Sequence, residues 1–271
     1  MSDKNDQPKN TFTGDLGKYQ ILETEDGSKT LHSEAFNEAC HSLSGAVEET
    51  LYNYVEGCEI LEKLIKNDLT CLEVGFGLGT GYKTTVEYLA QTKPSNKLTF
   101  ISTELDAKLV EYATIENKIE KDLPYPDFSS MELRREPVEH YIAEKESHKL
   151  IILIGDARQT VLKAYESNLV AGVGAIYQDP FSPKKNPALW TVEWFELLAK
   201  VSSEDVTLST YSSSNSIRKS LIQAGWKVFN RIGFGTKRTA TKARLIGESD
   251  EEVLLQLGRS PVKALEDSDI K

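Results

Sequence analysis

The chain has 271 residues, 39% of them hydrophobic, and its formal net charge at pH 7 is −10. This size and composition fit one large packed domain with a modest additional element. The absence of any run of about 18 apolar residues argues against a transmembrane helix, and the polar first 15 residues do not resemble a signal peptide. We therefore expect a cytoplasmic protein that does not contact a membrane.

The three cysteines are spread along the sequence as Cys40, Cys58 and Cys71, and none belongs to a CxxC pair. Such spacing predicts neither a zinc site nor a disulfide framework. We interpret them as reduced thiols and expect no metal.

The acidic total conceals an uneven distribution of charge. Residues 206–247 contain no Asp or Glu but eight basic residues, namely Arg218, Lys219, Lys227, Arg231, Lys237, Arg238, Lys242 and Arg244. A basic stretch in an acidic chain is compatible with a localised phosphate-binding surface. A solvated face is the alternative interpretation.

The N-terminal region differs in pattern from the rest of the chain. We expect disordered tails over residues 1–14 and 259–271 because both are polar and charged. Residues 15–66 predict an extended segment over 17–33, followed by a helical cap from about 35 to 66. Gly45 and Gly57 would interrupt that helix, since glycine weakens a helix interior.

Residues 67–258 alternate between short apolar runs and helical segments, which predicts an α/β core. The expected strands are 70–74, 98–103, 149–154, 173–178, 206–211 and 226–233. The expected helices are 80–92, 105–121, 137–145, 157–165, 191–201 and 214–225. Continuous apolar runs separated by helices predict a doubly wound, mostly parallel, Rossmann-like sheet. Ligands of such sheets bind beyond the carboxyl ends of the strands.

A glycine-rich loop follows the first core strand and reads Glu73-Val-Gly75-Phe-Gly77-Leu-Gly79. Alternating glycines let the backbone turn tightly and approach a ligand before a helix begins. The dinucleotide pattern GxGxxG is not met. The loop resembles the first motif of S-adenosylmethionine methyltransferases, in which it surrounds the methionine part of the ligand. A tight turn without a ligand is the alternative.

Two further strands end in acidic residues. Glu104 ends the second core strand, where a carboxylate can accept hydrogen bonds from both ribose hydroxyls. Asp156 follows the third strand, where it could accept from an adenine amino group while Ala157 leaves room for the ring. Each acid could instead serve only to begin a helix.

The fourth strand leads into Asp179-Pro180-Phe181-Ser182-Pro183. This segment resembles the Asp/Asn-Pro-Pro-aromatic motif of methyltransferases that act on amines. Prolines stiffen the loop, the carboxylate can accept a hydrogen bond from an amine, and the aromatic ring can stack on a base. A structural turn is the alternative.

A longer resemblance covers about residues 19–244. The segment DPFSPKKNPALW, the later IGFGTKR and the earlier DGSKTLHS are similar to the methyltransferase domain of the MnmC family. That family completes 5-methylaminomethyl-(2-thio)uridine at the wobble position of certain tRNAs. The resemblance implies a class I S-adenosylmethionine methyltransferase that acts on the anticodon loop of tRNA. It implies no FAD, because the chain is too short for the family's oxidase domain, and a separate oxidase or other aminomethyl-forming enzyme could act upstream.

The resemblance also assigns roles to individual residues. It implies that Asp179 and Phe181 are catalytic, that Asp179 binds the substrate amine, and that S-adenosylmethionine contacts Glu73, Gly75, Gly77, Gly79, Glu104, Asp156 and Ala157. The candidates for tRNA phosphate contacts are Lys184, Lys185, Lys237 and Arg238. We expect Trp190 and Trp194 to be core residues, whereas His41 and Ser42 either line the pocket from the cap or are simply buried.

Two other functions fit the same pattern. An aminopropyltransferase of the spermidine synthase kind has a similar core, although a polyamine site would need more acidic residues than the 206–247 stretch offers. A catalytically silent RNA-binding module with a methyltransferase fold is the third hypothesis.

Overall fold

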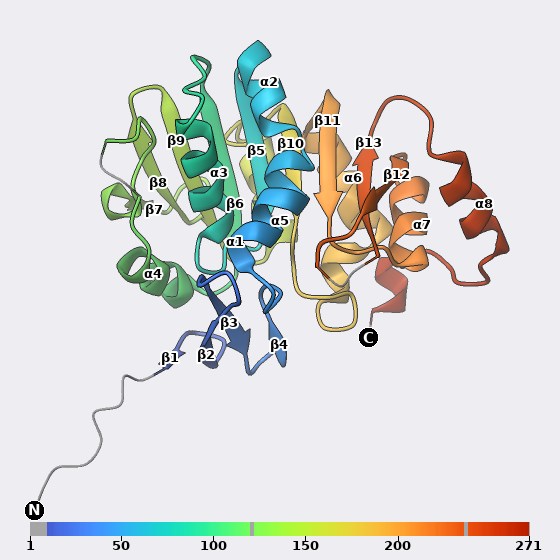
Figure 1. The fold of residues 1–271 in the computed structure, drawn as a ribbon, viewed down its shortest axis with the longest axis horizontal. Helices are drawn as coiled ribbons and strands as arrows, with labels where there is room; N and C mark the ends of the chain where they lie inside the picture. The colour runs from blue at the N-terminus through green and yellow to red at the C-terminus, as the bar shows by residue number, and fades with distance from the viewer. Residues whose placement is uncertain (1–9, 120–121, 236–237, 271) are drawn as a thin grey trace, which may run out of the picture.

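The computed structural model describes residues 10–119, 122–235 and 238–270, and Figure 1 shows its two sheets. A small antiparallel sheet contains β1 (Thr11–Thr13), β2 (Lys18–Glu23), β3 (Lys29–Ser33) and β4 (Glu38–Ala39), in that order. Three short helices follow: α1 (Ala46–Thr50), the π-helix η1 (Leu51–Glu56) and α2 (Ile60–Lys66). The small sheet lies beyond one end of the central sheet (Figure 1).

The central sheet has nine strands in the order β12-β13-β11-β10-β5-β6-β9-β8-β7. Its members are β5 (Leu69–Val74), β6 (Leu98–Glu104), β7 (Glu132–Arg134), β8 (His140–Lys145), β9 (His148–Ile154), β10 (Val173–Gln178), β11 (Ser202–Thr210), β12 (Lys227–Ile232) and β13 (Thr239–Arg244). The five middle strands, β11 to β9, are parallel, and the pairs on either side of them are antiparallel.

Helices cover both faces of this sheet (Figure 1). They are α3 (Thr80–Ala90), α4 (Ala107–Glu116), α5 (Ala157–Glu166), α6 (Val192–Val201), α7 (Asn215–Gln223) and α8 (Glu251–Arg259), with short 3-10 turns at η2 (Phe128–Ser130), η3 (Pro187–Trp190) and η4 (Asp267–Asp269). Successive strand residues face opposite sides, so Leu72 and Ile151 pack against α5 and α6, whereas Cys71 and Ile152 belong to the core beneath α3 and α4. The predicted doubly wound α/β fold is confirmed.

The strand order places a switch point between β5 and β10. The chain leaves β5 through α3 toward β6 on one side, while β10 pairs with the other side of β5. The loops that follow two such strands diverge to opposite faces and leave a crevice at their carboxyl ends. The structure therefore has a place for a ligand where the sequence predicts one.

Two predicted elements are wrong, and the prediction omits one strand. Residues 137–145 were expected to be helical, but His140–Lys145 is strand β8, joined to β9 by a tight turn at Glu146 with φ 52°. The expected helix from residue 35 begins only at Ala46, and β4 with its turns occupies the preceding segment. Strand β13 was not predicted, because its Thr- and Lys-rich sequence lacks an apolar run and pairs antiparallel at the edge of the sheet.

The ends of the chain are more ordered than predicted within the described residues. Thr11–Thr13 pairs with β2, while residues 1–9 of the expected N-terminal tail lie outside the described residues. Near the C-terminus, Leu265 packs against the core, and Arg158 forms an ion pair with Asp267. The Val192 amide also donates a backbone hydrogen bond to the Leu265 carbonyl oxygen at 2.8 Å and holds this segment in place. No helix in the described part of the chain is long and apolar enough to span a bilayer.

A single buried carboxylate fastens the small sheet to the core. Asp106 is fully buried and caps α4 by accepting from the Leu109 amide at 3.1 Å. It also accepts from the Asp15 amide (2.9 Å), the Leu16 amide (3.0 Å) and the Tyr19 hydroxyl (2.9 Å). Hydrogen bonds to a buried charge are among the strong ones, so Asp106 sets the path of residues 14–19.

We predict that Asp106→Ala lowers the free energy of unfolding by about 3 to 5 kcal/mol, because several buried donors lose their acceptor. Urea unfolding would measure the loss, and limited proteolysis should show faster cleavage in residues 10–20. Asp15→Ala is the matched control, since the exposed Asp15 carboxylate contacts Lys108 through a surface ion pair and a hydrogen bond from the Lys108 amide, which contribute little. Equal stability of Asp106→Ala and the wild type would contradict the assignment.

Candidate active site

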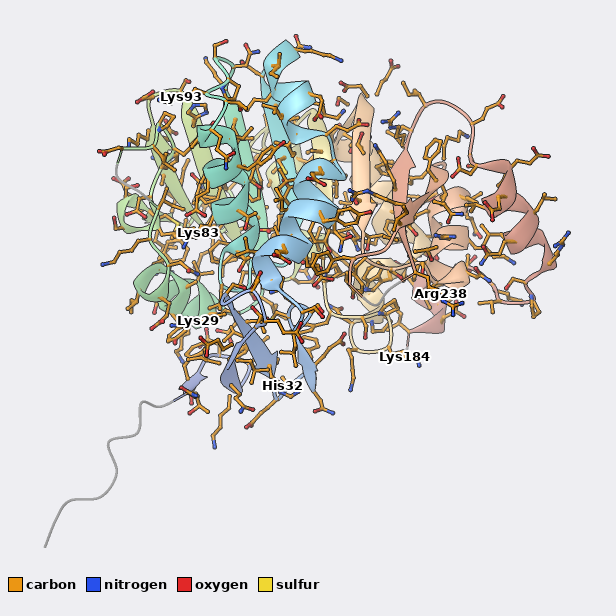
Figure 2. The ribbon with its side chains drawn as sticks, viewed as in Figure 1. Lys29, His32, Lys83, Lys93, Lys184 and Arg238 are labelled. Atoms are coloured by element: carbon orange, nitrogen blue, oxygen red, sulfur yellow. The ribbon has the colours of Figure 1, made fainter. Side chains whose placement is uncertain are left out.

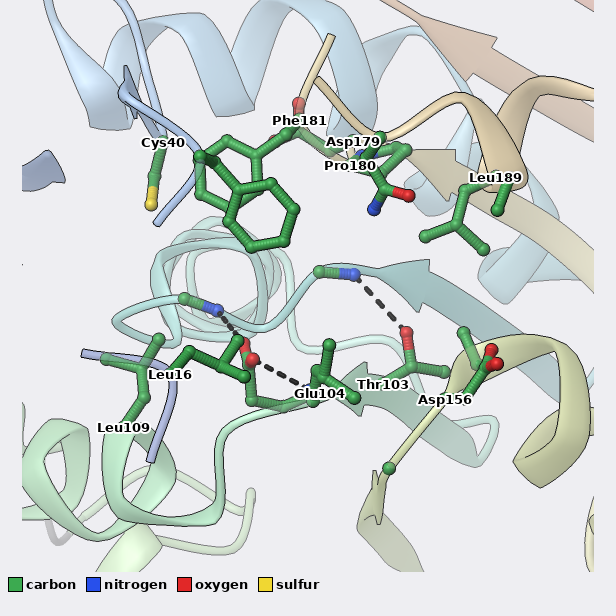
Figure 3. A pocket seen from close by; sticks show the side chains of 18 of the residues that line it. Leu16, Cys40, Thr103, Glu104, Leu109, Asp156, Asp179, Pro180, Phe181 and Leu189 are labelled. Atoms are coloured by element: carbon green, nitrogen blue, oxygen red, sulfur yellow. Dashed lines mark hydrogen bonds between the residues drawn. The ribbon is translucent and has the colours of Figure 1, made fainter. Parts of the chain in front are cut away.

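A cavity of about 370 Å³ lies at the carboxyl ends of the parallel strands. Seven of the nine residues predicted to bind S-adenosylmethionine or to be catalytic line it: Gly75, Gly77, Glu104, Asp156, Ala157, Asp179 and Phe181. Figure 3 shows Glu104 and Asp156 across the cavity from Asp179 and Phe181. Loops from four separate strands thus converge on one space, as the sequence predicts.

The glycine loop forms one wall. Gly75 has φ +101°, and a Cβ there would lie 3.1 Å from the Asp179 carbonyl oxygen, so a side chain would push apart the loops after β5 and β10. The loop is fixed from below because the Gly75 amide donates to Thr103 Oγ1 at 3.3 Å (Figure 3). Close approach of backbone to a ligand is therefore possible at this wall.

Glu73 and Gly79, also predicted to surround the ligand, do not line the cavity. Glu73 is buried under the first turn of α3 and accepts from Ser102 Oγ at 2.6 Å. A Cβ on Gly81 would lie only 1.6 Å from Glu73 Oε1, so the carboxyl group occupies the space that this glycine leaves. Burial raises the pKa of Glu73 well above its usual range. We assign Glu73 to supporting the loop from beneath.

Glu104 points into the cavity from the end of β6. Its carboxyl group accepts from the amides of Gly77 (3.1 Å), Leu105 (2.8 Å) and Asp106 (3.0 Å). Burial raises the pKa of Glu104 to about 7, although these three donors lower it. The group can therefore gain or lose its proton close to neutral pH.

Asp156 both caps a helix and lines the cavity, which are the two roles that the sequence analysis gives as alternatives. It is the N-cap of α5 and accepts from the Arg158 amide at 2.9 Å, and it also lines the cavity. The adjacent Ala157 is small and nearly buried, so it leaves a flat surface beside the carboxylate. Capping and ligand contact are compatible because a carboxylate has two oxygens.

Asp179 is held from the N-terminal region of the chain. The Tyr54 hydroxyl donates to Asp179 Oδ1 at 2.5 Å, and His41 Nε2 lies 3.9 Å from Oδ2. The His41 contact meets the distance criterion for an ion pair, but burial lowers the pKa of His41, which favours the neutral imidazole. We therefore regard Tyr54 as a hydrogen-bonding partner of Asp179, and His41 as a neutral neighbour that lines the cavity.

Two aromatic rings form the opposite side of the opening. Phe181 stacks on Phe36 with ring centroids 4.3 Å apart, and its carbonyl accepts from Trp190 Nε1 at 2.9 Å. Trp190 and Trp194 are fully buried, as predicted. Sequence reasoning missed Phe36 and Tyr54, because neither belongs to a motif and both reach the site only through the arrangement of the N-terminal elements.

The basic residues divide into two groups. Arg218 is buried and donates to Thr241 and Ala240, and Arg244 forms an ion pair with Glu59. These side chains stabilise the fold. Lys184, Lys185 and Arg238 are exposed, and Lys184 and Arg238 appear in the same part of the view in Figure 2. Lys237 lies outside the described residues.

The lining fits a nucleoside that carries a sulfonium. Glu104 offers acceptors for a ribose diol, Leu105 and Leu109 supply apolar contacts for a base, and the three carboxylates of Glu104, Asp156 and Asp179 suit a cation. Within the described ranges, no group of three or more His, Cys, Asp or Glu side chains is arranged to hold a metal ion.

The comparisons with known proteins agree with this geometry. A family described as S-adenosyl-L-methionine-dependent methyltransferase matches residues 127–246. The crystal structure of MnmC2 from Aquifex aeolicus superposes with a TM-score of 0.71 at 30% identity, over 93% of this chain and 80% of that one. The chain belongs to the MnmC2 family of S-adenosyl-L-methionine-dependent methyltransferases.

The chain is also similar to two other proteins. The tRNA 5-methylaminomethyl-2-thiouridine biosynthesis bifunctional protein MnmC of Legionella pneumophila is 29% identical over 236 residues, which are 76% of this chain and 34% of that protein. The chain thus spans about a third of the length of this curated relative. Spermidine synthase from Thermotoga maritima, at 14% identity and a TM-score of 0.50 over 95% of this chain and 80% of that one, shares the fold alone.

We predict that nucleoside binding weakens as the pH falls through about 7, because a ribose diol needs the ionised Glu104 as acceptor and the raised pKa of Glu104 makes it protonated below that pH. Methylthioadenosine is a suitable probe, since it has no group that titrates near neutrality. Calorimetry should give a Kd that rises roughly tenfold per pH unit below 7. Glu104→Gln should bind weakly and independently of pH, and a wild-type Kd that is constant from pH 5 to 8 would contradict this role.

Proposed function

We propose that this chain methylates the amine of 5-aminomethyl-(2-thio)uridine at the wobble position of tRNA, giving 5-methylaminomethyl-(2-thio)uridine, with S-adenosylmethionine as methyl donor. The observation that carries the proposal is the Asp179 carboxylate, which faces the cavity at the switch point beside Phe181. The names of the MnmC relatives support the substrate, because they specify tRNA 5-methylaminomethyl-2-thiouridine.

S-adenosylmethionine supplies a methyl group on a sulfonium sulfur. The amine lone pair attacks the methyl carbon and forms the N–C bond, while the C–S bond breaks and its electrons remain on sulfur. An alkylamine has a pKa of roughly 10 in water and is mostly protonated at neutral pH. Asp179 would accept a hydrogen bond from the amine, orient its lone pair and take up the proton that nitrogen loses. Positioning and proton transfer together are what such a site can contribute.

The other residues that line the cavity suit an RNA base that is flipped out of the anticodon loop. A wobble nucleotide lies in a single-stranded loop, so it can be splayed out at small cost. The stacked pair of Phe36 and Phe181 offers an aromatic surface for the base. Gly75, Gly77, Asp156 and Ala157 would contact the methyl donor together with Glu104, whereas Glu73 and Gly79 would act by shaping the loop.

Contacts to the tRNA backbone remain part of this proposal. Lys184, Lys185 and Arg238 are exposed and suit phosphate oxygens, and Lys237 is a fourth candidate from the sequence alone. A tRNA substrate implies action in the cytoplasm, and an aminomethyl-forming enzyme such as an FAD-dependent oxidase would act before this one. The proposal itself includes no FAD and no metal.

The test is nucleoside mass spectrometry of tRNA that carries 5-aminomethyl-(2-thio)uridine, incubated with the purified protein and S-adenosylmethionine. We expect the aminomethyl nucleoside to gain one methyl group. A parallel incubation with putrescine and decarboxylated S-adenosylmethionine tests the aminopropyltransferase alternative. Cofactor binding without transfer to any tRNA would instead favour a silent RNA-binding module and would refute the proposal.

In the same assay, we predict that Asp179→Ala lowers turnover by about 10²- to 10⁴-fold, which is the usual contribution of a positioned proton acceptor. The Kd for S-adenosylhomocysteine should change little, because other residues form the nucleoside wall. Glu204→Ala is the control, since this acid lies exposed at the start of β11, at the opposite end of the sheet. Near-wild-type turnover of Asp179→Ala would remove Asp179 from the mechanism.

A further inference from the structure

Tyr54 donates a hydrogen bond to Asp179, and it comes from an unusual element. It lies in the π-helix η1 and is 2% exposed. π-helical turns are rare and are found frequently at functional sites. The Tyr54 hydroxyl donates to Asp179 Oδ1 across 125 residues of sequence, so the N-terminal cap reaches directly into the predicted reaction centre.

The backbone of this π-helix is held by two residues of the central sheet. Arg231 Nη1 donates to the carbonyl oxygens of Tyr52 (2.5 Å) and Asn53 (3.1 Å), and Ser209 Oγ donates to Asn53 at 2.5 Å. The Arg231 guanidinium also lies over the Tyr52 ring, 4.2 Å from its centroid. One member of the basic 206–247 stretch therefore fixes the element that carries Tyr54.

The same junction explains Gly57, which directly follows η1. A Cβ at this position would lie 1.9 Å from the Asn53 carbonyl oxygen, and 2.6 Å from both Arg231 Nη1 and Ser209 Oγ. Only glycine leaves room for the two donors to reach the π-helix. The predicted helix interruption at Gly57 is thus where these contacts converge.

The ring and hydroxyl of Tyr54 are fixed as well. The ring stacks on Tyr177 of β10, with centroids 5.4 Å apart and planes at 29°. Burial raises the pKa of Tyr54 well above its usual range, and the nearby Asp179 raises it further. The phenol therefore stays protonated and acts as a donor toward the carboxylate, not as a base.

We propose that Tyr54 is a positioning residue, whose hydroxyl holds Oδ1 of Asp179 and so fixes the orientation in which this carboxylate faces the substrate amine. This inference rests on the proposed function of Asp179. Neutral His41 lies 3.9 Å from Oδ2, which is beyond hydrogen-bonding distance. The hydrogen bond from Tyr54 therefore restricts the rotation of the Asp179 carboxylate at the cavity wall.

The test compares Tyr54→Phe with Tyr52→Phe. Both remove one hydroxyl from the same π-helix, but the Tyr52 hydroxyl donates to the Ile232 carbonyl oxygen and does not reach Asp179. We expect Tyr54→Phe to lower kcat about ten- to a hundredfold, as the loss of a hydrogen bond to a charged group implies, with KM for tRNA and the Kd for S-adenosylhomocysteine unchanged. Tyr52→Phe should keep the wild-type kcat.

Two further measurements separate positioning from general damage to the fold. In an Asp179→Asn background, Tyr54→Phe should cause little additional loss, since a residue that acts through Asp179 has nothing left to position. Crystal structures of the variants should show the Asp179 carboxylate displaced in Tyr54→Phe and unmoved in Tyr52→Phe. An unchanged kcat, additive losses in the double variant, or an unmoved Asp179 in Tyr54→Phe would each overturn the inference.

The structural readout does not depend on activity. If the wild-type protein transfers no methyl group to tRNA, the proposed function fails. The position of Asp179 in the Tyr54→Phe structure still decides whether Tyr54 holds this carboxylate.

Discussion

Three carboxylates face one cavity, and the electrostatic cost of bringing them together is the constraint on which the site depends. Glu104, Asp156 and Asp179 come from three different strand ends, each stabilised by its own donors: backbone amides for Glu104 and Asp156, and a phenol for Asp179. Burial disfavours the charged form of a carboxylate, as the raised pKa of Glu104 shows, and like charges that share one cavity disfavour it further. A cationic ligand relieves this cost, so a cavity with this lining favours a sulfonium over a neutral or anionic ligand.

The parallel sheet and its loops provide most of the cavity lining. A smaller part comes from the N-terminal region, where Leu16, Phe36 and His41 line the space. These elements are fastened to the core at two points far apart in the structure: the buried Asp106 holds residues 14–19, and Arg231 with Ser209 holds the π-helix. The small sheet and its helices therefore enclose a site whose chemical groups the strands supply.

The sequence predicts those strands and site residues that are marked by a pattern within one short stretch of the chain. Buried parallel strands are continuous apolar runs, and the acids that follow them can be identified by position, which is how Glu104, Asp156 and Asp179 were found. Strand β8 was missed because its alternation of buried and exposed residues is incomplete, with Ile142 and Ala143 both buried. Tyr54 and Phe36 could not be found, because their places depend on tertiary contacts between segments more than 100 residues apart in sequence.

The central claim is that one bound nucleoside contacts the ends of β6, β9 and β10 together. A crystal structure of the complex with S-adenosylhomocysteine tests it most directly. The account predicts both ribose hydroxyls within about 3.2 Å of the Glu104 carboxylate, the adenine beside Asp156 and Ala157, and the sulfur directed toward Asp179. A ligand bound elsewhere, or in this cavity with its ribose away from Glu104, would contradict the account.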